Sequence, residues 1–165
     1  MSEKIEEFRK KLESASSYSE VWETVKATVE FTLKRRRSGM MLFLDDLPIQ
    51  VGAYHPLGTN NIVLNRVLVQ IVETSVKERR VVNALLYILL LHEYLHSLGE
   101  YSAAGARRLV VDVAKKCFGT DHIVTSIAVK SPWVLLRDIP LSAVNLPKRV
   151  MEIVKNFEKT DEYVV

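Results

Sequence analysis

The stretch Leu90-Leu91-His92-Glu93-Tyr94-Leu95-His96-Ser97-Leu98-Gly99 decides which fold we predict for this chain. It completes an apolar run that begins at Ala84, and such a run predicts a helix that is buried on all sides. Because side chains four positions apart share one face of a helix, His92 and His96 are placed to bind one metal ion together. Glu93 then lies within reach of a water molecule at that metal. Zinc suits this pattern, since imidazole nitrogen is one of its preferred ligands and water fills an open position.

The composition of the 165 residues is that of an ordinary folded protein. Hydrophobic residues make up 48% of the chain and charged residues 26%, so disorder is not expected. The length predicts a single domain over residues 1–165. Within it we distinguish an N-terminal pair of helices over residues 1–38, a core over residues 39–130 that contains the motif, and a C-terminal extension over residues 131–165.

Charge and cysteine content restrict the setting in which the chain works. The formal net charge of +3 permits contact with an anionic partner but does not argue for one. The single cysteine, Cys117, excludes an internal disulfide and fits a reducing, cytoplasmic compartment. The N-terminus is too charged for a secretory signal. The unbroken apolar run is far shorter than the roughly 20 residues that a bilayer requires, so we expect no contact with a membrane.

Two helices and three strands are predicted before the motif. Apolar spacing predicts helices over residues 2–16 and from a capping box at Ser17 and Glu20 to Lys34. We expect the basic cluster over residues 34–37 to be a solvated face; a phosphate-contacting patch is the alternative, and nucleic acid is not an expected partner. Short apolar and β-branched segments predict strands over residues 40–44, 49–54 and 61–65.

Further helices are predicted around and after the motif. Asn65 is placed to cap a helix that precedes the motif helix over residues 78–98. Helices follow over residues 102–118, which Ser102 is placed to cap, and from about residue 120. A last helix is predicted from Pro147, where Val150, Ile153, Val154 and Phe157 have helical spacing. The expected fold is therefore α+β: a small, mostly antiparallel sheet of about three strands precedes a buried active-site helix, which packs with several further helices.

The pattern His92-Glu93-x-x-His96 resembles the signature of the zincin metallopeptidases, and the strands before it match the order of elements in that family. The resemblance covers roughly residues 40–120. It implies that His92 and His96 bind Zn²⁺, that Glu93 is the catalytic general base and acid, and that the chain hydrolyses a peptide or protein substrate. It also implies an edge strand that pairs with an extended peptide. We expect this edge strand over residues 61–65, with Ile62, Val63 and Leu64 as substrate-binding residues.

The third metal ligand fits neither large branch of the zincins. Metzincins have histidine or aspartate six positions after the second histidine, where this chain has Ser102. Gluzincins use a glutamate from the following helix, but Ala104, Gly105 and Ala106 stand at the expected level. The remaining candidates are His122, Glu100, Asp112 and His55. We predict His122 as the third ligand, with Glu100 as the main alternative, because zinc favours imidazole. The zincin branch stays unassigned, and a gluzincin-like branch is the candidate.

Several aromatic and basic side chains are interpreted as structural. We expect Trp22 and Trp133 in the core and Arg107-Arg108 on a solvated face. Tyr94 and Tyr101 are expected to serve packing, with a hydrogen bond to an oxyanion as the alternative. A second functional hypothesis retains the zincin scaffold as a regulatory or binding module without general proteolysis, associated with nucleic acid through residues 34–37. The sequence sets neither the substrate nor the oligomeric state.

Overall fold

The computed structural model describes residues 2–139 and 147–158. In chain order its elements are α1 (Glu3–Glu13), α2 (Tyr18–Leu33), β1 (Met41–Asp45), β2 (Ala53–Tyr54), β3 (Asn61–Asn65), α3 (Arg66–Val76), α4 (Arg79–Ser97), α5 (Ala103–Phe118), α6 (Ile123–Lys130), the 3₁₀ helix η1 (Pro132–Leu136) and β4 (Glu152–Ile153). The predicted α+β class is confirmed.

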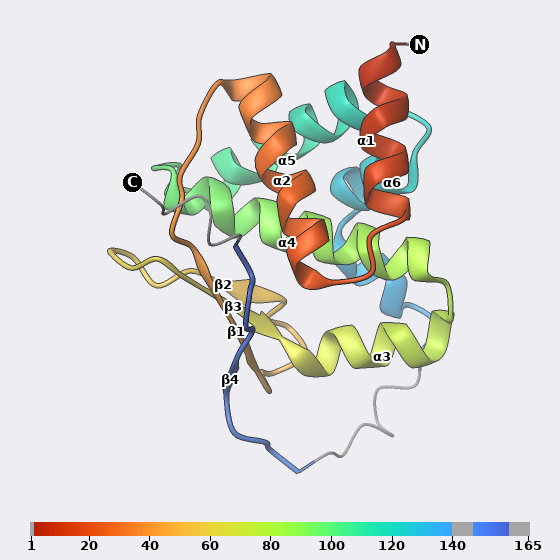
Figure 1. Cartoon of the computed structure of the whole chain (residues 1–165). Helices are drawn as coiled ribbons and strands as arrows, with labels where there is room; N and C mark the ends of the chain where they lie inside the picture. The colour runs from red at the N-terminus through yellow and green to blue at the C-terminus, as the bar shows by residue number, and fades with distance from the viewer. Residues whose placement is uncertain (1, 140–146, 159–165) are drawn as a thin grey trace.

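Helix α4, which contains the motif, runs through the middle of the molecule. Helices α1, α2, α5 and α6 pack on one side of it, and the sheet and α3 lie on the other (Figure 1). Every residue from Ala84 to Leu91 is buried, as the apolar run predicts. A single hydrophobic cluster joins α4 to both chain ends, since it includes Phe8 from α1 and Phe157 from the C-terminal segment.

Side-chain caps fix the starts of the helices that surround α4. The Ser17 hydroxyl accepts a hydrogen bond from the Glu20 N–H, and the Ser102 hydroxyl accepts one from the Gly105 N–H. Asn65 caps α3 by accepting from the Val67 N–H. These caps satisfy backbone donors that a helix leaves free in its first turn, and all three were predicted from residue type and spacing.

The sheet contains four strands in the order β2-β3-β1-β4. β1 and β3 pair in parallel over their full length, from Met41 opposite Asn61 to Asp45 opposite Asn65. The two outer pairings, β2 with β3 and β4 with β1, are antiparallel and short. The sheet is therefore mixed, and its longest pairing is parallel. The strand predicted over residues 49–54 is shorter than expected and spans only Ala53–Tyr54.

The prediction of a last helix from Pro147 is wrong. Residues 152–153 form β4 on the edge of β1, because the segment is held by partners that are distant in the sequence. Arg149 donates hydrogen bonds to both carboxylate oxygens of Asp46, and Glu158 accepts from the Trp22 indole N–H. Helical spacing is a local signal and does not register such contacts. The tail over residues 160–163, expected to be loose, lies outside the described residues.

None of the helices in the described part of the chain is long and apolar enough to cross a lipid bilayer.

Candidate metal and active site

The two motif histidines converge on one point at the C-terminal end of α4. Their rings meet edge to face, with ring centroids 4.6 Å apart and an angle of 83° between the ring planes. The two Nε2 atoms are 3.0 Å apart. With zinc–nitrogen bonds of about 2.0–2.1 Å, two nitrogens of a tetrahedral site are about 3.3 Å apart. A small opening of the pair would therefore admit the ion.

The surrounding backbone fixes the tautomer of His96. Its Nδ1 lies 2.7 Å from the carbonyl oxygen of Glu100, and because a carbonyl only accepts, Nδ1 must donate. Gly99 makes this contact feasible, since its φ of 108° reverses the chain directly after the helix. The Nε2 atom of His96 then carries no hydrogen, and its lone pair accepts from the Nε2–H of His92 across the 3.0 Å contact. The contact from Nδ1 to a carbonyl is the arrangement that orients a metal-binding histidine.

Glu93 is a buried carboxyl group without a partner. Its residue is 6% exposed, and it makes no hydrogen bond or ion pair with any residue that the structure describes. Burial raises the pKa of this carboxyl to about 7. A carboxyl group with such a pKa both accepts and releases a proton readily near neutral pH, which is the property required of a general base and acid.

His92 is held in its neutral form. Burial, together with the charges of His96 and Arg107, lowers the pKa of the imidazole to about 4. A metal binds the neutral imidazole, and the proton that His92 Nε2 donates to His96 would move to Nδ1 when an ion binds.

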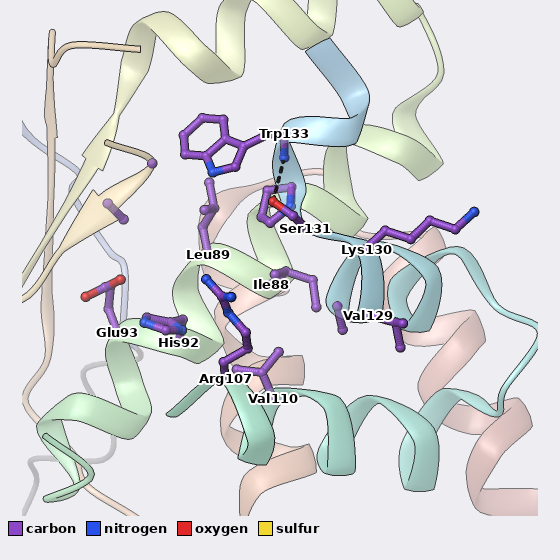
Figure 2. A pocket seen from close by; sticks show the side chains of 14 residues that line it. Ile88, Leu89, His92, Glu93, Arg107, Val110, Val129, Lys130, Ser131 and Trp133 are labelled. Atoms are coloured by element: carbon purple, nitrogen blue, oxygen red, sulfur yellow. Dashed lines mark hydrogen bonds between the residues drawn. The ribbon is translucent and has the colours of Figure 1, made fainter. Parts of the chain in front are cut away.

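A cavity of about 210 Å³ opens beside Glu93 and His92 (Figure 2). Its walls come from β2 and its preceding residue, from α4 and α5, and from the turn that joins α6 to η1. The lining residues are Gly52, Ala53, Ile88, Leu89, His92, Glu93, Arg107, Val110, Ala128, Val129, Lys130, Ser131, Pro132 and Trp133. Gly52 allows β2 to approach α4 closely, because a Cβ at this position would lie 2.7 Å from a methyl carbon of Leu89.

The strand next to this cavity is β2, and the prediction that residues 61–65 form the edge strand is wrong. β3 is paired on both sides, and its Ile62, Val63 and Leu64 are buried at 0–3% exposure, so they do not reach a substrate. The sequence indicates strands but not their order in the sheet. The Asn65 N–H on β3 donates to the Gly52 carbonyl. In an antiparallel ladder, the residue after a hydrogen-bonded one directs its N–H and C=O away from the partner strand, and here that residue is Ala53. The backbone of Ala53 therefore faces outward at the cavity.

The structure does not bring His122 to the histidine pair, so the predicted third ligand is wrong. His122 caps α6, where its Nδ1 accepts from the Val124 N–H and its Nε2 lies 3.1 Å from a carboxylate oxygen of Glu13. His122 lines a surface pocket together with Arg80, which lies at the start of α4. Arg80 and His92 are twelve residues apart on this helix, a distance of about 18 Å along its axis, so His122 lies at the opposite end of α4 from His92. The sequence does not show whether the loop between α5 and α6, which contains His122, lies near the N-terminal or the C-terminal end of α4.

The other candidates also stand apart from the pair. The carboxylate of Glu100 packs against the first turn of α5, at a position that a Cβ on residue 105 would overlap. Asp112 is exposed on α5, and Nδ1 of His55 contacts the carbonyl of Asn61. Over residues 2–139 and 147–158, no three histidine, cysteine, aspartate or glutamate side chains form a group able to hold a metal.

Two lining residues were assigned other roles by the sequence. Trp133 was expected in the core, but it is 38% exposed and lies over the cavity (Figure 2). Arg107 is exposed, as expected of a solvated face, and its side chain also extends from α5 toward His92 and lines the cavity (Figure 2). The only local signal was Ser131-Pro132 before Trp133, where Ser131 has a φ of 112° and turns the chain back toward the cavity.

The basic cluster at the end of α2 is partly structural. Arg35 donates to the carbonyl of Leu98 and Arg37 to that of Ser97, the latter at 2.7 Å. Both carbonyls belong to the C-terminal end of α4, where positive charge is favourable. These guanidinium groups therefore hold the end of the motif helix. Residues 34–36 are exposed, as expected of a solvated face, and Arg37 is half-buried.

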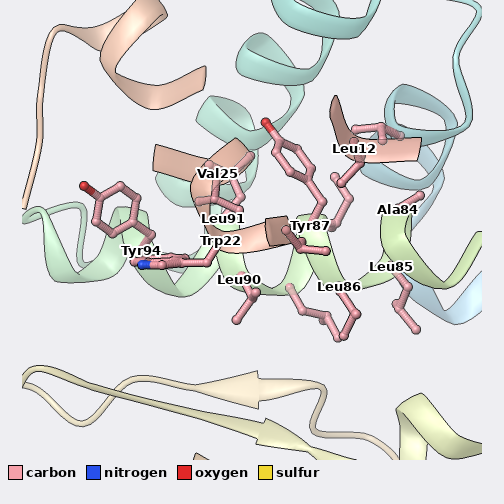
Figure 3. Packing of buried hydrophobic residues seen from close by; sticks show 14 of the residues in the cluster. Leu12, Trp22, Val25, Ala84, Leu85, Leu86, Tyr87, Leu90, Leu91 and Tyr94 are labelled. Atoms are coloured by element: carbon pink, nitrogen blue, oxygen red, sulfur yellow. The ribbon is translucent and has the colours of Figure 1, made fainter. Parts of the chain in front are cut away.

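The tyrosines near the motif have the packing roles expected of them or lie in solvent. Tyr94 is fully buried against Trp22, with ring centroids 4.8 Å apart, and its hydroxyl accepts from the Arg37 N–H (Figure 3). Tyr101 is 71% exposed. Neither ring lines the cavity beside Glu93.

No family model, no curated protein and no solved structure matches this chain.

Proposed function

We propose that this chain is a zinc-dependent metallopeptidase, in which His92 and His96 hold the ion and Glu93 is the general base and acid. One observation supports this above the rest: two convergent imidazole Nε2 atoms stand beside a buried carboxyl group that has no partner, at the mouth of a cavity. A purely structural histidine pair would have no need for such a carboxyl group, whose burial is unfavourable.

The donor set fits zinc in kind. Two imidazoles supply nitrogen ligands, and the contact from His96 to the Glu100 carbonyl provides the usual support of such a ligand. Glu100 follows the motif directly, but its carboxylate would have to leave the first turn of α5 to become a third protein ligand. When bound, zinc acts as a Lewis acid that polarises a substrate carbonyl and lowers the pKa of water.

The residues of the chain would perform the proton transfers and position the substrate. Glu93 takes a proton from the attacking water and gives it to the leaving amine nitrogen, which its pKa near 7 permits at neutral pH. The outward N–H and C=O of Ala53 pair with the backbone of an extended peptide, which aligns the scissile bond with Glu93. The cavity beyond Glu93 takes the next side chain of the substrate.

The test uses the zinc-loaded full chain and a mixture of peptides analysed by mass spectrometry. Glu93→Gln is expected to retain zinc and to lower the rate of cleavage by about 10²- to 10⁴-fold. Asp112→Asn is the matched control, since it removes an exposed carboxylate that lies outside the cavity, and it should cleave at the wild-type rate. Zinc-loaded wild type that cleaves no peptide, or Glu93→Gln that cleaves at the wild-type rate, would contradict the proposal.

A second candidate function is a peptide-binding module that does not hydrolyse its ligand. The observation in its favour is that the described residues bring no third ligand to the histidine pair. This module would bind extended peptides at β2, with Ala53, and leave them intact. Association with nucleic acid through residues 34–37 receives no support, because Arg35 and Arg37 already contact the carbonyls of α4.

A further inference from the structure

The cavity beside the motif has an apolar interior and a cationic side. Its interior is lined by Ile88, Leu89, Val110 and Ala128. The acidic and basic side chains that line it, histidine aside, are Glu93 at the mouth, Arg107 and Lys130. Lys130 extends away from the cavity, whereas Arg107 extends toward its centre (Figure 2).

Arg107 has no carboxylate of its own. It makes no ion pair and no hydrogen bond with any residue in the described part of the chain. A guanidinium binds carboxylates through two parallel hydrogen bonds, so an arginine at this position favours an anionic ligand. Arg108, its neighbour in sequence, does not line the cavity.

We infer that this cavity binds the C-terminal residue of a peptide, with its carboxylate on Arg107 and an apolar side chain against Ile88, Leu89 and Val110. A cavity of about 210 Å³ has room for an apolar side chain. An aspartate or glutamate side chain would pair with Arg107 but leave the apolar interior uncovered. A terminal apolar residue satisfies both.

This inference rests on the proposed function only where cleavage is concerned. The bond next to the terminal residue would lie beside Glu93 and His92, so the chain would act as a carboxypeptidase. Water adds its hydroxyl to the carbonyl carbon, the carbon–nitrogen bond breaks, and the proton passes to the released amino group. Binding of the terminal residue itself requires only Arg107 and the apolar interior.

Fluorescence of Trp133 measures this binding without zinc. Trp22 is fully buried away from the cavity, so a change on ligand addition reports Trp133, and Trp133→Phe should abolish it. The probes are N-acetyl-leucine and its amide, added to the metal-free full chain. The carboxylate should bind roughly tenfold more tightly than the amide. Arg107→Ala should remove this difference, Arg107→Lys should restore part of it, and Arg108→Ala should leave it unchanged.

Equal binding of the two probes, or a preference for the carboxylate that persists in Arg107→Ala, would overturn the inference whether or not the chain binds zinc. Tight binding of N-acetyl-leucine by a chain that cleaves nothing would support the site and count against the proposed peptidase. If the zinc-loaded chain cleaves peptides, those with a free C-terminus should lose one residue. Equally fast cleavage of C-terminally amidated peptides would overturn the inference and leave the peptidase proposal standing.

Discussion

A histidine lies near each end of α4: His122, the cap of α6, near the N-terminal end, and the motif pair on α4 itself at the C-terminal end. At the N-terminal end, His122 uses both ring nitrogens in contacts with the protein, and Asn83 donates to the carbonyls of Leu12 and Ala15. At the C-terminal end, the Nε2 atoms of His92 and His96 face each other, and Glu93 has no partner within the described residues. The Asn83 Oδ1 atom is buried without a partner among the described residues, so satisfaction of polar atoms does not by itself separate the two ends. The difference is that the N-terminal groups join segments of the fold, whereas His92 and Glu93 line a cavity.

This contrast separates stability from function along one helix. A change at the N-terminal end should lower the free energy of unfolding without affecting metal binding. A change at the C-terminal end should remove function and, for the buried carboxyl, raise stability, as is common for residues kept for activity.

The largest effect on stability is expected for Asn83→Ala. Asn83 is fully buried and joins the loop after α1 to α4 through two hydrogen bonds of 2.8 and 3.0 Å. Its removal leaves buried carbonyl groups without this donor and creates a small void, which should cost about 3 kcal/mol. Chemical denaturation at pH 7 measures this loss. If the folded variant binds zinc with wild-type affinity, the N-terminal end of α4 contributes to stability and not to metal binding. A lower zinc affinity in the folded variant would contradict this separation of the two ends.

A smaller effect of opposite sign is expected for Glu93→Gln in the metal-free chain. Because burial raises the pKa of Glu93 to about 7, the folded state binds more protons than the unfolded state between about pH 4.5 and 7. The wild type therefore loses stability as the pH rises through this range, and glutamine does not. The variant should be more stable than wild type by on the order of 2 kcal/mol at pH 8.

This difference should vanish below about pH 4, where Glu93 is neutral in both states. The opposite contribution of His92, whose lowered pKa makes it destabilising in acid, is common to both proteins and cancels in their difference. A variant that is less stable than wild type at pH 8 would indicate that the Glu93 carboxylate has a favourable partner after all.

The smallest effect is expected for His122→Ala, which should lower stability by about 1 kcal/mol. The change removes the cap of α6 and the contact with Glu13. His122→Asn is the matched control, because asparagine preserves the cap and removes only the contact with Glu13. Thermal unfolding should therefore place His122→Asn between wild type and His122→Ala, and equal losses in both variants would show that the cap contributes nothing.

The sequence predicted the parts of the fold that depend on local pattern. The apolar run from Ala84 to Leu91, the caps at Ser17, Asn65 and Ser102, and the placement of His92 and His96 on one face all follow from residue type and helical spacing. These features depend on neighbours within about one turn of helix, which the chain itself supplies.

The parts that failed depend on contacts between distant segments. The order of strands, the strand at residues 152–153 and the position of His122 are set by which segments meet in space. Arg107 and Trp133 are the clearest cases, since an arginine on a helix and a tryptophan after a proline have many ordinary roles. The packing of α5 against α4 places Arg107 at the cavity, and the return of the α6–η1 turn to α4 places Trp133 there.

Zinc titration of the metal-free chain tests the central claim most directly, with His92→Ala, His96→Ala and His122→Ala measured beside the wild type. We predict that the wild type and His122→Ala bind one zinc ion per chain with the same affinity. His92→Ala and His96→Ala should each lose this binding, because one remaining imidazole cannot replace the pair. Wild type that binds no zinc, or binding that survives the loss of His92 or His96, would contradict the account.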